Sequence, residues 1–268
     1  MIAFAGNSLL CRLALKSTGI DPASFTSIRI ISGALVLWLI TRIRGQAAWN
    51  AGSWQSASAL FVYATGFSLA YVSLPIATGT LLLFGAVQVT MIEYGLWTGE
   101  RLGAPRYTGL ICALGGLVGL LLPGLTAPPL PGSVLMLGAG IAWGVYSLRS
   151  KGIGDPTTAT AGNFLRAVPM AVALSLIALP WHSLNSFGVG YAIASGALAS
   201  GAGYAIWYTA LRGLKTTSAA TIQLSVPVIT AVGGIIFLGE TITLRFLIAS
   251  AAILFGIALV PVSRRTNP

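Results

Sequence analysis

Long apolar runs dominate this sequence, and only a few charged or turn-forming residues separate them. Of the 268 residues, 56% are hydrophobic and 7% are charged, whereas a soluble domain carries roughly 25% charged residues. Such a chain cannot cover itself with a hydrated surface, so lipid is its expected solvent. The runs show no alternation of polar and apolar residues, which favours transmembrane helices over the strands of a membrane barrel.

Proline, glycine and charged residues divide these runs into ten segments, each of which we expect to be a helix. Spanning the hydrocarbon core takes about 20 residues, so ten spans with short turns fill the chain and leave no room for a soluble domain. The first segment is short, because 16 residues of helix cover about 24 Å of a core about 30 Å thick. The expected segments are 1–16, 22–41, 54–73, 76–98, 104–122, 131–149, 158–180, 186–211, 216–238 and 243–262.

The basic residues fall mainly on one side of the expected membrane. Although the formal charge is +10, the basic residues come in ones and twos at helix flanks and form no patch for nucleic acid. On the opposite side only Lys16 and Arg245 flank helices, with Arg12 about one turn inside. The positive-inside rule therefore predicts that both termini are cytoplasmic. The residues on the cytoplasmic side are Arg42, Arg44, Arg101, Arg106, Arg149, Lys151, Arg212, Lys215, Arg264 and Arg265.

Several landmarks recur in the same order in the two halves of the chain. Because each half holds five expected spans, the second half must enter the membrane from the opposite side. The pattern predicts an inverted repeat, with five-helix units at 1–124 and 130–265. The paired landmarks are Asp21-Pro22 with Asp155-Pro156, Arg29 with Arg166, Gly99-Glu100 with Gly239-Glu240, and Gly116 with Gly256.

These landmarks, together with the segment Ala5-Gly6-Asn7-Ser8-Leu9-Leu10-Cys11-Arg12, resemble those of the drug/metabolite transporter superfamily in its bacterial EamA-type branch. The resemblance covers nearly the whole chain, apart from the leading turns that the first helix usually has. It implies ten helices around a central cavity that opens alternately to either side of a bacterial plasma (inner) membrane. It also implies a small-molecule substrate and surrounding lipid, and we expect no cofactor, metal or nucleic acid. Proton coupling and the choice between monomer and homodimer are left open.

Two charged residues inside the spans suggest an inner gate. A charge deep in a span costs at least about 2.5–3.5 kcal/mol, so each needs a reason. Glu93 is the only carboxylate well inside a span, and Arg166 lies at a similar depth from the same side. We therefore predict a Glu93–Arg166 pair that gates or couples transport. The alternative is a fixed ion pair, or a Glu93 side chain that extends to the headgroups.

Arg29 is the third candidate for gating or coupling. It lies at a comparable depth from the other side, but the repeat places Gly233 where Glu93 stands in the first half. Its possible partners are Glu240 or Asp21 at the rim, the carbonyls at a helix end, or an anionic group on the substrate.

Polar and aromatic residues within the spans are candidates for the substrate cavity. Asn7 stands between Gly6 and Ser8, which allow close backbone approach. Interhelical hydrogen bonding, or an aromatic belt at the membrane surface, is the structural alternative for such residues. Pro227 in the ninth segment is expected to kink its helix, either as a hinge or as a fixed bend. The predicted cavity residues are Asn7, Trp143, Tyr146, Tyr204 and Tyr208.

The expected function is export of amino acids or related amphipathic compounds by alternating access. An intramembrane enzyme is one alternative, but the chain has a single histidine, His182, and lacks the common hydrolase and phosphate-binding motifs. A channel is another alternative, which the repeat disfavours because it supplies two nearly equivalent states.

Overall fold

Helices are the only regular secondary structure in the part of the chain that the structure describes. A computed structural model describes all residues except 99–103, 123, 125–126, 151–152, 212–224 and 259–268, and only the backbone of 104–106, 208, 211 and 257. Within this part, each predicted apolar segment falls on a helix, and the described ends agree with the prediction to about three residues. Gly99-Glu100 and the basic residues Arg101, Lys151, Arg212, Lys215, Arg264 and Arg265 lie outside it.

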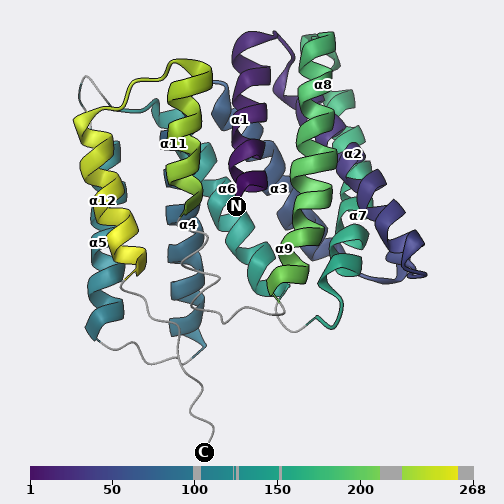
Figure 1. The fold of residues 1–268 in the computed structure, drawn as a ribbon, viewed down its shortest axis with the longest axis horizontal. Helices are drawn as coiled ribbons and strands as arrows, with labels where there is room; N and C mark the ends of the chain where they lie inside the picture. Colours follow the sequence, from purple (N-terminus) through teal and green to yellow (C-terminus); the bar gives the residue numbers. More distant parts are fainter. Residues whose placement is uncertain (99–103, 123, 125–126, 151–152, 212–224, 259–268) are drawn as a thin grey trace, which may run out of the picture.

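The helices run side by side as one bundle (Figure 1). The α-helices are α1 (Ile2–Ser17), α2 (Pro22–Ile43), α3 (Trp54–Tyr71), α4 (Ile76–Trp97), α5 (Ala104–Leu121), α6 (Leu130–Arg149), α7 (Pro156–Ile177), α8 (Ser186–Ala194), α9 (Gly203–Leu211), α11 (Ser225–Leu238) and α12 (Leu244–Ala258). Short 3-10 helices, η1 (Ala48–Asn50) and η2 (Leu179–Trp181), follow α2 and α7, and a π-helix, η3 (Ser195–Ala202), joins α8 to α9.

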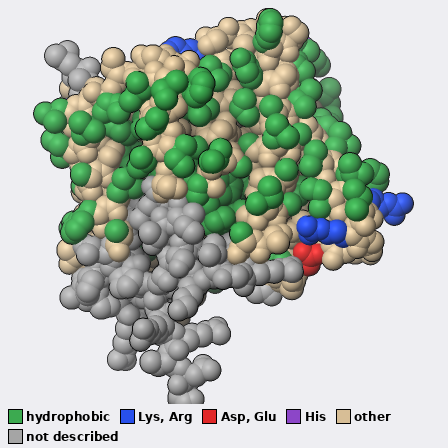
Figure 2. All heavy atoms as spheres, viewed as in Figure 1, with side chains coloured by type: hydrophobic (Ala, Val, Ile, Leu, Met, Phe, Trp, Pro, Cys, Tyr) green, Lys and Arg blue, Asp and Glu red, His purple; other side chains and the backbone are tan. Residues whose placement is uncertain are grey.

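The surface of the bundle is that of a membrane protein. Hydrophobic side chains are spread over the described part of the face seen in Figure 2, and the charged side chains visible there lie near its edges. Shorter apolar helices cover 107–121, 225–238 and 244–256, and the number of spans remains a prediction. Within the described residues, five helical segments can cross a membrane by length and composition: Pro22–Ile43, Ile76–Trp97, Leu130–Arg149, Pro156–Ile177 and the continuous Ser186–Trp207.

The order of elements in the first half recurs in the second. Helices α2 and α7 each have 22 residues, start with proline, and are followed by a 3-10 helix and a newly capped helix. Asp21 and Asp155 cap them, since each carboxylate accepts two backbone N–H groups of the first turn. The two helices pack against each other, and the Ser27 hydroxyl donates to the Ala171 carbonyl at 2.8 Å. The halves thus share their local structure, while the inverted topology remains a prediction.

Loops of one half hold helices of the other at both ends of the bundle. At one end, named here the Asp21 end, Asp21 and Ser183 exchange two hydrogen bonds of 3.0 Å. At the opposite end, the Asp155 end, the Ser53 N–H donates to Asn163 Oδ1 at 2.9 Å. Gly52 has φ +80° there, and a Cβ on it would collide with Asn163. The α2–α3 loop is therefore seated closely on α7.

The two caps predict a pH-dependent stability. Burial alone would raise the pKa of Asp155, but hydrogen bonds from Thr158 and Thr157 outweigh it, and the pKa lies below its ordinary value. Asp155→Ala should lower the free energy of unfolding by about 1 kcal/mol, whereas asparagine is a comparable cap. The pKa of Asp155 is lower in the folded protein than in the unfolded chain. The charged carboxylate therefore contributes its full stabilisation of the fold above the unfolded pKa, about 3.9, and this contribution is lost as the pH falls through the folded pKa.

Thermal unfolding of the protein in detergent, measured at pH 7 and pH 3, tests this. The difference in midpoint between wild type and Asp155→Ala should shrink at the lower pH. An equal difference at both values would contradict a charge-dependent cap.

Candidate functional site

Arg29 lies two turns into α2 and is the largest fully buried side chain, with 2% of its surface exposed. Its Nε donates to Ser200 Oγ at 3.3 Å and its Nη2 to the Tyr63 hydroxyl at 3.1 Å. The guanidinium carbon lies 5.3 Å from the ring centre of Tyr63 and 5.1 Å from that of Phe67, within the range of cation–π attraction. Its Nη1 has no hydrogen-bond partner.

A chain of hydrogen bonds extends from Arg29 to the first helix. The Tyr63 hydroxyl also accepts a long bond, 3.5 Å, from Asn7 Nδ2, and Asn7 Oδ1 accepts from Ser195 Oγ at 2.6 Å. We name Asn7, Arg29, Tyr63, Ser195 and Ser200 the central polar cluster. It joins α1, α2 and α3 to the π-helix. Each of these polar groups is buried where water is scarce, so the partners must come from the protein.

The π-helix brings its two serines to this cluster. Segments with i→i+5 hydrogen bonding are rare and occur often at functional sites. Gly196 lets the segment approach α2, because a Cβ there would collide with the Arg29 carbonyl oxygen and the Ser32 hydroxyl. Nothing in the sequence indicated a π-helix at this point of the chain.

An aromatic cluster continues from Tyr63. The Trp143 ring on α6 lies 4.7 Å from Tyr63, 5.3 Å from Tyr204 on α9 and 5.3 Å from Tyr146, which it stacks on. These distances are those of rings in contact, so the middle of the bundle is packed. Tyr146 in turn accepts a 3.5 Å hydrogen bond from Asn163 on α7.

Four of the five predicted cavity residues meet at this centre: Asn7, Trp143, Tyr146 and Tyr204. The side chain of Tyr208 lies outside the described residues. Sequence analysis missed Tyr63, Phe67 and Ser195. In the sequence these residues stand out only as polar or aromatic side chains within an apolar run. Many residues of this chain have the same feature, so it did not distinguish them. Whether these residues contact a substrate remains a prediction.

The predicted Glu93–Arg166 pair is not formed in this structure. Arg166 instead donates to the carbonyl oxygens of Trp49 at 2.9 Å and of Ala51. Glu93 is exposed on α4. Equal depth from one membrane face was the basis of the prediction, and depth does not determine which way a side chain points around the bundle. A role of either residue in gating or coupling stays a prediction.

Glu240, one of the possible partners named for Arg29, pairs with Arg12 instead. Arg12 Nε lies 3.5 Å from Glu240 Oε1, and the two side chains are 11% and 12% exposed. Arg12 Nη1 also donates to the Tyr71 carbonyl at 2.7 Å, while Glu240 Oε2 accepts the Ile76 N–H at 2.8 Å. Glu240 thus caps the start of α4. It does not cap α12, the next helix along the chain, where the Phe246 N–H donates to the Thr243 hydroxyl at 3.1 Å.

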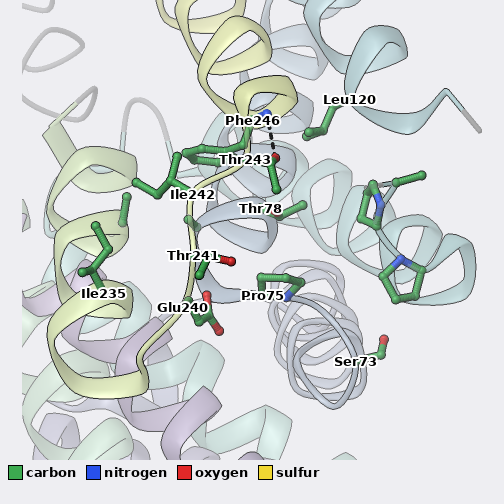
Figure 3. A pocket seen from close by; sticks show the side chains of 15 residues that line it. Ser73, Pro75, Thr78, Leu120, Ile235, Glu240, Thr241, Ile242, Thr243 and Phe246 are labelled. Atoms are coloured by element: carbon green, nitrogen blue, oxygen red, sulfur yellow. Dashed lines mark hydrogen bonds between the residues drawn. The ribbon is translucent and has the colours of Figure 1, made fainter. Parts of the chain in front are cut away.

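Two cavities lie toward the ends of the bundle. One of about 220 Å³ at the Asp21 end is bordered by Glu240, Pro75 and Ile235, as Figure 3 shows. The other, of about 560 Å³, lies at the Asp155 end, and Asn163 belongs to its lining. Since Asn163 bonds to Tyr146, this cavity reaches the edge of the aromatic cluster. Neither of these two cavities is lined by the central polar cluster, and a central cavity stays a prediction.

Pro227 lies in the described part of α11, Ser225–Leu238. Residues 216–224 of the predicted segment lie outside the description, so the expected kink at Pro227 stays a prediction. An interior proline does occur at Pro169 in α7.

This arrangement, an apolar helical bundle around a buried polar and aromatic centre, is that of a membrane transport protein. The sequence model of the EamA-like transporter family matches residues 130–261. The chain is 54% identical to an uncharacterized protein of Pseudomonas aeruginosa over 261 residues, covering 97% of this chain and 91% of that one. The chain belongs to the EamA-like transporter family, and so to the drug/metabolite transporters. It is a membrane protein that transports a small molecule.

More distant relatives agree. The chain is 37% identical to the threonine/homoserine exporter RhtA of Escherichia coli K12 over 132 residues, covering 47% of this chain and 43% of RhtA. It is 28% identical over 260 residues to an uncharacterized transporter of Archaeoglobus fulgidus, covering 90% and 87%. A protein crystal structure with 20% sequence identity shares the fold, with a TM-score of 0.66 over 96% of this chain and 95% of that chain.

The Arg12–Glu240 pair predicts strong coupling between the two residues. Removing one partner leaves the other charge buried without compensation, so Arg12→Met should cost on the order of 3 kcal/mol of stability. The double variant Arg12→Met/Glu240→Gln should lose less than the sum of the two single variants, as measured by denaturant unfolding in detergent. Lys16→Met is the matched control, since Lys16 is exposed on the same helix. Additive losses would contradict the coupling.

Proposed function

We propose that the protein exports amino acids or related amphipathic metabolites across a bacterial inner membrane by alternating access. The observation that carries this proposal is the central polar and aromatic cluster. It is built from both halves of the chain, with Arg29 and Tyr63 from the first, and Ser200, Trp143 and Tyr204 from the second. A site made by two halves is reshaped whenever they move against each other, which is what a transporter needs.

Two five-helix repeats, 1–124 and 130–265, would make this movement possible. Repeats of opposite orientation give two arrangements of nearly equal energy, one open to each side. The pairing of α2 with α7, two helices with the same length and the same Asp-Pro start, supports such a relation. A rocking motion would take place about this pair.

The contacts at the two ends would then act as gates. At the Asp21 end, Arg12 and Glu240 join α1 to the α11–α12 turn. At the Asp155 end, Arg166 and Asn163 hold the α2–α3 loop. Alternating access requires that one set opens while the other stays closed. We therefore propose that Arg166 forms part of the inner gate by bonding to backbone carbonyls of the α2–α3 loop, and that Glu93 takes no part in this contact.

The substrate class is proposed from the relatives and from the chemistry of the centre. RhtA is named as an exporter of threonine and homoserine, which are small and amphipathic. The rings of Trp143, Tyr146 and Tyr204 could hold an apolar portion, while Asn7 and its hydroxyl neighbours suit polar groups.

Transport in proteoliposomes tests the proposal. With a pH gradient imposed, L-threonine or L-homoserine should accumulate against its own gradient. Trp143→Ala should reduce the initial rate at least about tenfold, because Trp143 joins Tyr63 and Tyr204 at the centre and a central contact is worth about 1.4 kcal/mol or more. Trp181→Ala is the control, since Trp181 is 74% exposed at a helix end.

The same assay separates the alternatives. Purely downhill flux would indicate a channel, and chemical conversion without flux an enzyme. Glu93→Gln examines proton coupling, because loss of pH-driven accumulation with retained exchange is expected only if Glu93 carries the proton. Equal accumulation by wild type and Glu93→Gln would rule out that role.

Orientation is tested by cysteine labelling in intact cells. In a background of Cys11→Ala and Cys112→Ala, Leu184→Cys at the Asp21 end should react with an impermeant maleimide. Ala47→Cys at the Asp155 end should react only after lysis, since the positive-inside rule places this end in the cytoplasm. Both positions are exposed. The reverse pattern would overturn the predicted orientation of both termini.

A further inference from the structure

The charge of Arg29 is not balanced by any described residue. The chain contains five acidic residues. Of the four that the structure describes, Asp21 and Asp155 cap helices at the two ends, Glu240 pairs with Arg12, and Glu93 is exposed on α4. Among the described residues, no carboxylate oxygen lies within ion-pair distance of Arg29. A cation at this depth is costly unless it is paired, and such residues mark substrate pathways in membrane proteins.

The unused donors of Arg29 lie together. A guanidinium has five N–H groups, of which Nε uses one on Ser200 and Nη2 uses one on Tyr63. Both hydrogens of the buried Nη1 are without a partner. The Tyr63 oxygen accepts from Arg29 and from Asn7, so its own hydrogen remains for an acceptor. The centre of the bundle therefore offers unused donors and one positive charge, and no described carboxylate lies there to accept from them.

We infer that Arg29 binds a carboxylate group of the transported molecule through Nη1, with Tyr63 as a second donor and the aromatic cluster around the remainder of the molecule. The fork of a guanidinium matches the two oxygens of a carboxylate. The single cation of the centre balances one negative charge, which suits a carboxylate better than a phosphate dianion. The inference rests on the proposed transport function and adds to it the anionic group that the substrate must have.

The surroundings of Arg29 explain how the anchor is held in this structure and how it becomes accessible when the two halves move. Cation–π contacts with Tyr63 and Phe67 hold one face of the guanidinium. Ser200 belongs to the π-helix of the second half, so movement between the halves alters the contact at Nε. Binding of a carboxylate at Nη1 would neutralise the buried charge and lower the cost of separating the halves around it.

Matched acid and amide ligands test this inference. The probes are L-threonine, L-leucine and L-phenylalanine and their carboxamides at pH 6, where both members of each pair carry an ammonium group and only the acid carries a carboxylate. Binding to the protein in lipid nanodiscs is measured by tryptophan fluorescence. In wild type, at least one acid should bind about tenfold or more tightly than its amide. Arg29→Gln should reduce this preference to about threefold or less.

Three further variants complete the test. Arg42→Gln, at an exposed position of the same helix, should keep the full preference. Arg29→Lys should keep part of it, since the charge remains but the fork is lost. Tyr63→Phe should weaken acid binding several-fold. This variant takes the place of Arg29→Gln in the test if Arg29→Gln does not fold.

Several results would overturn the inference. They are equal binding of acids and amides by wild type, binding of no acid, and an unchanged preference in Arg29→Gln and Tyr63→Phe. Accumulation of an uncharged or purely cationic probe in the flux assay would leave the transport proposal standing while this inference fails.

Discussion

The buried positive charge of Arg29 is the constraint to which the centre of this protein is adapted. A guanidinium inside a lipid-embedded bundle cannot be hydrated freely, so every neighbour has to be an aromatic face, a hydroxyl or a ligand. Tyr63 and Phe67 supply the faces, and Tyr63 and Ser200 supply the oxygens. Because these residues come from α2, α3 and the π-helix, one charge connects both halves of the chain.

At the ends of the bundle, buried or half-buried arginines bond to backbone carbonyl oxygens. Arg12 bonds to the carbonyl of Tyr71, and Arg166 to the carbonyls of Trp49 and Ala51. Carbonyls at helix ends and in loops need donors, and an arginine that reaches them ties two elements together without requiring an acidic partner. In a chain with 15 basic and 5 acidic residues, there are too few carboxylates for each basic residue to have its own, and backbone carbonyls serve as acceptors for Arg12 and Arg166.

The partners of the charged residues show where inference from sequence ends. Glu93 and Arg166 were paired because of their similar depth, and Glu240 was one of several possible partners of Arg29. In the structure Glu240 lies beside Arg12, and Arg166 bonds to a loop. Position along a helix follows from residue number at 1.5 Å per residue. The direction a side chain takes around the bundle depends on how neighbouring helices are rotated and packed, and no spacing within one segment contains that information.

The sequence by itself determined the membrane class, the helices with their ends, and the recurring Asp-Pro caps of α2 and α7, because these follow from local composition and the thickness of a bilayer. It also singled out Asn7, Trp143 and Arg29 as polar or aromatic groups that need partners. Only the tertiary structure decided that these partners meet at Tyr63, that a π-helix provides Ser195 and Ser200, and that Arg29 has no carboxylate among the described residues. These outcomes depend on contacts between segments up to 188 residues apart, which only packing brings together.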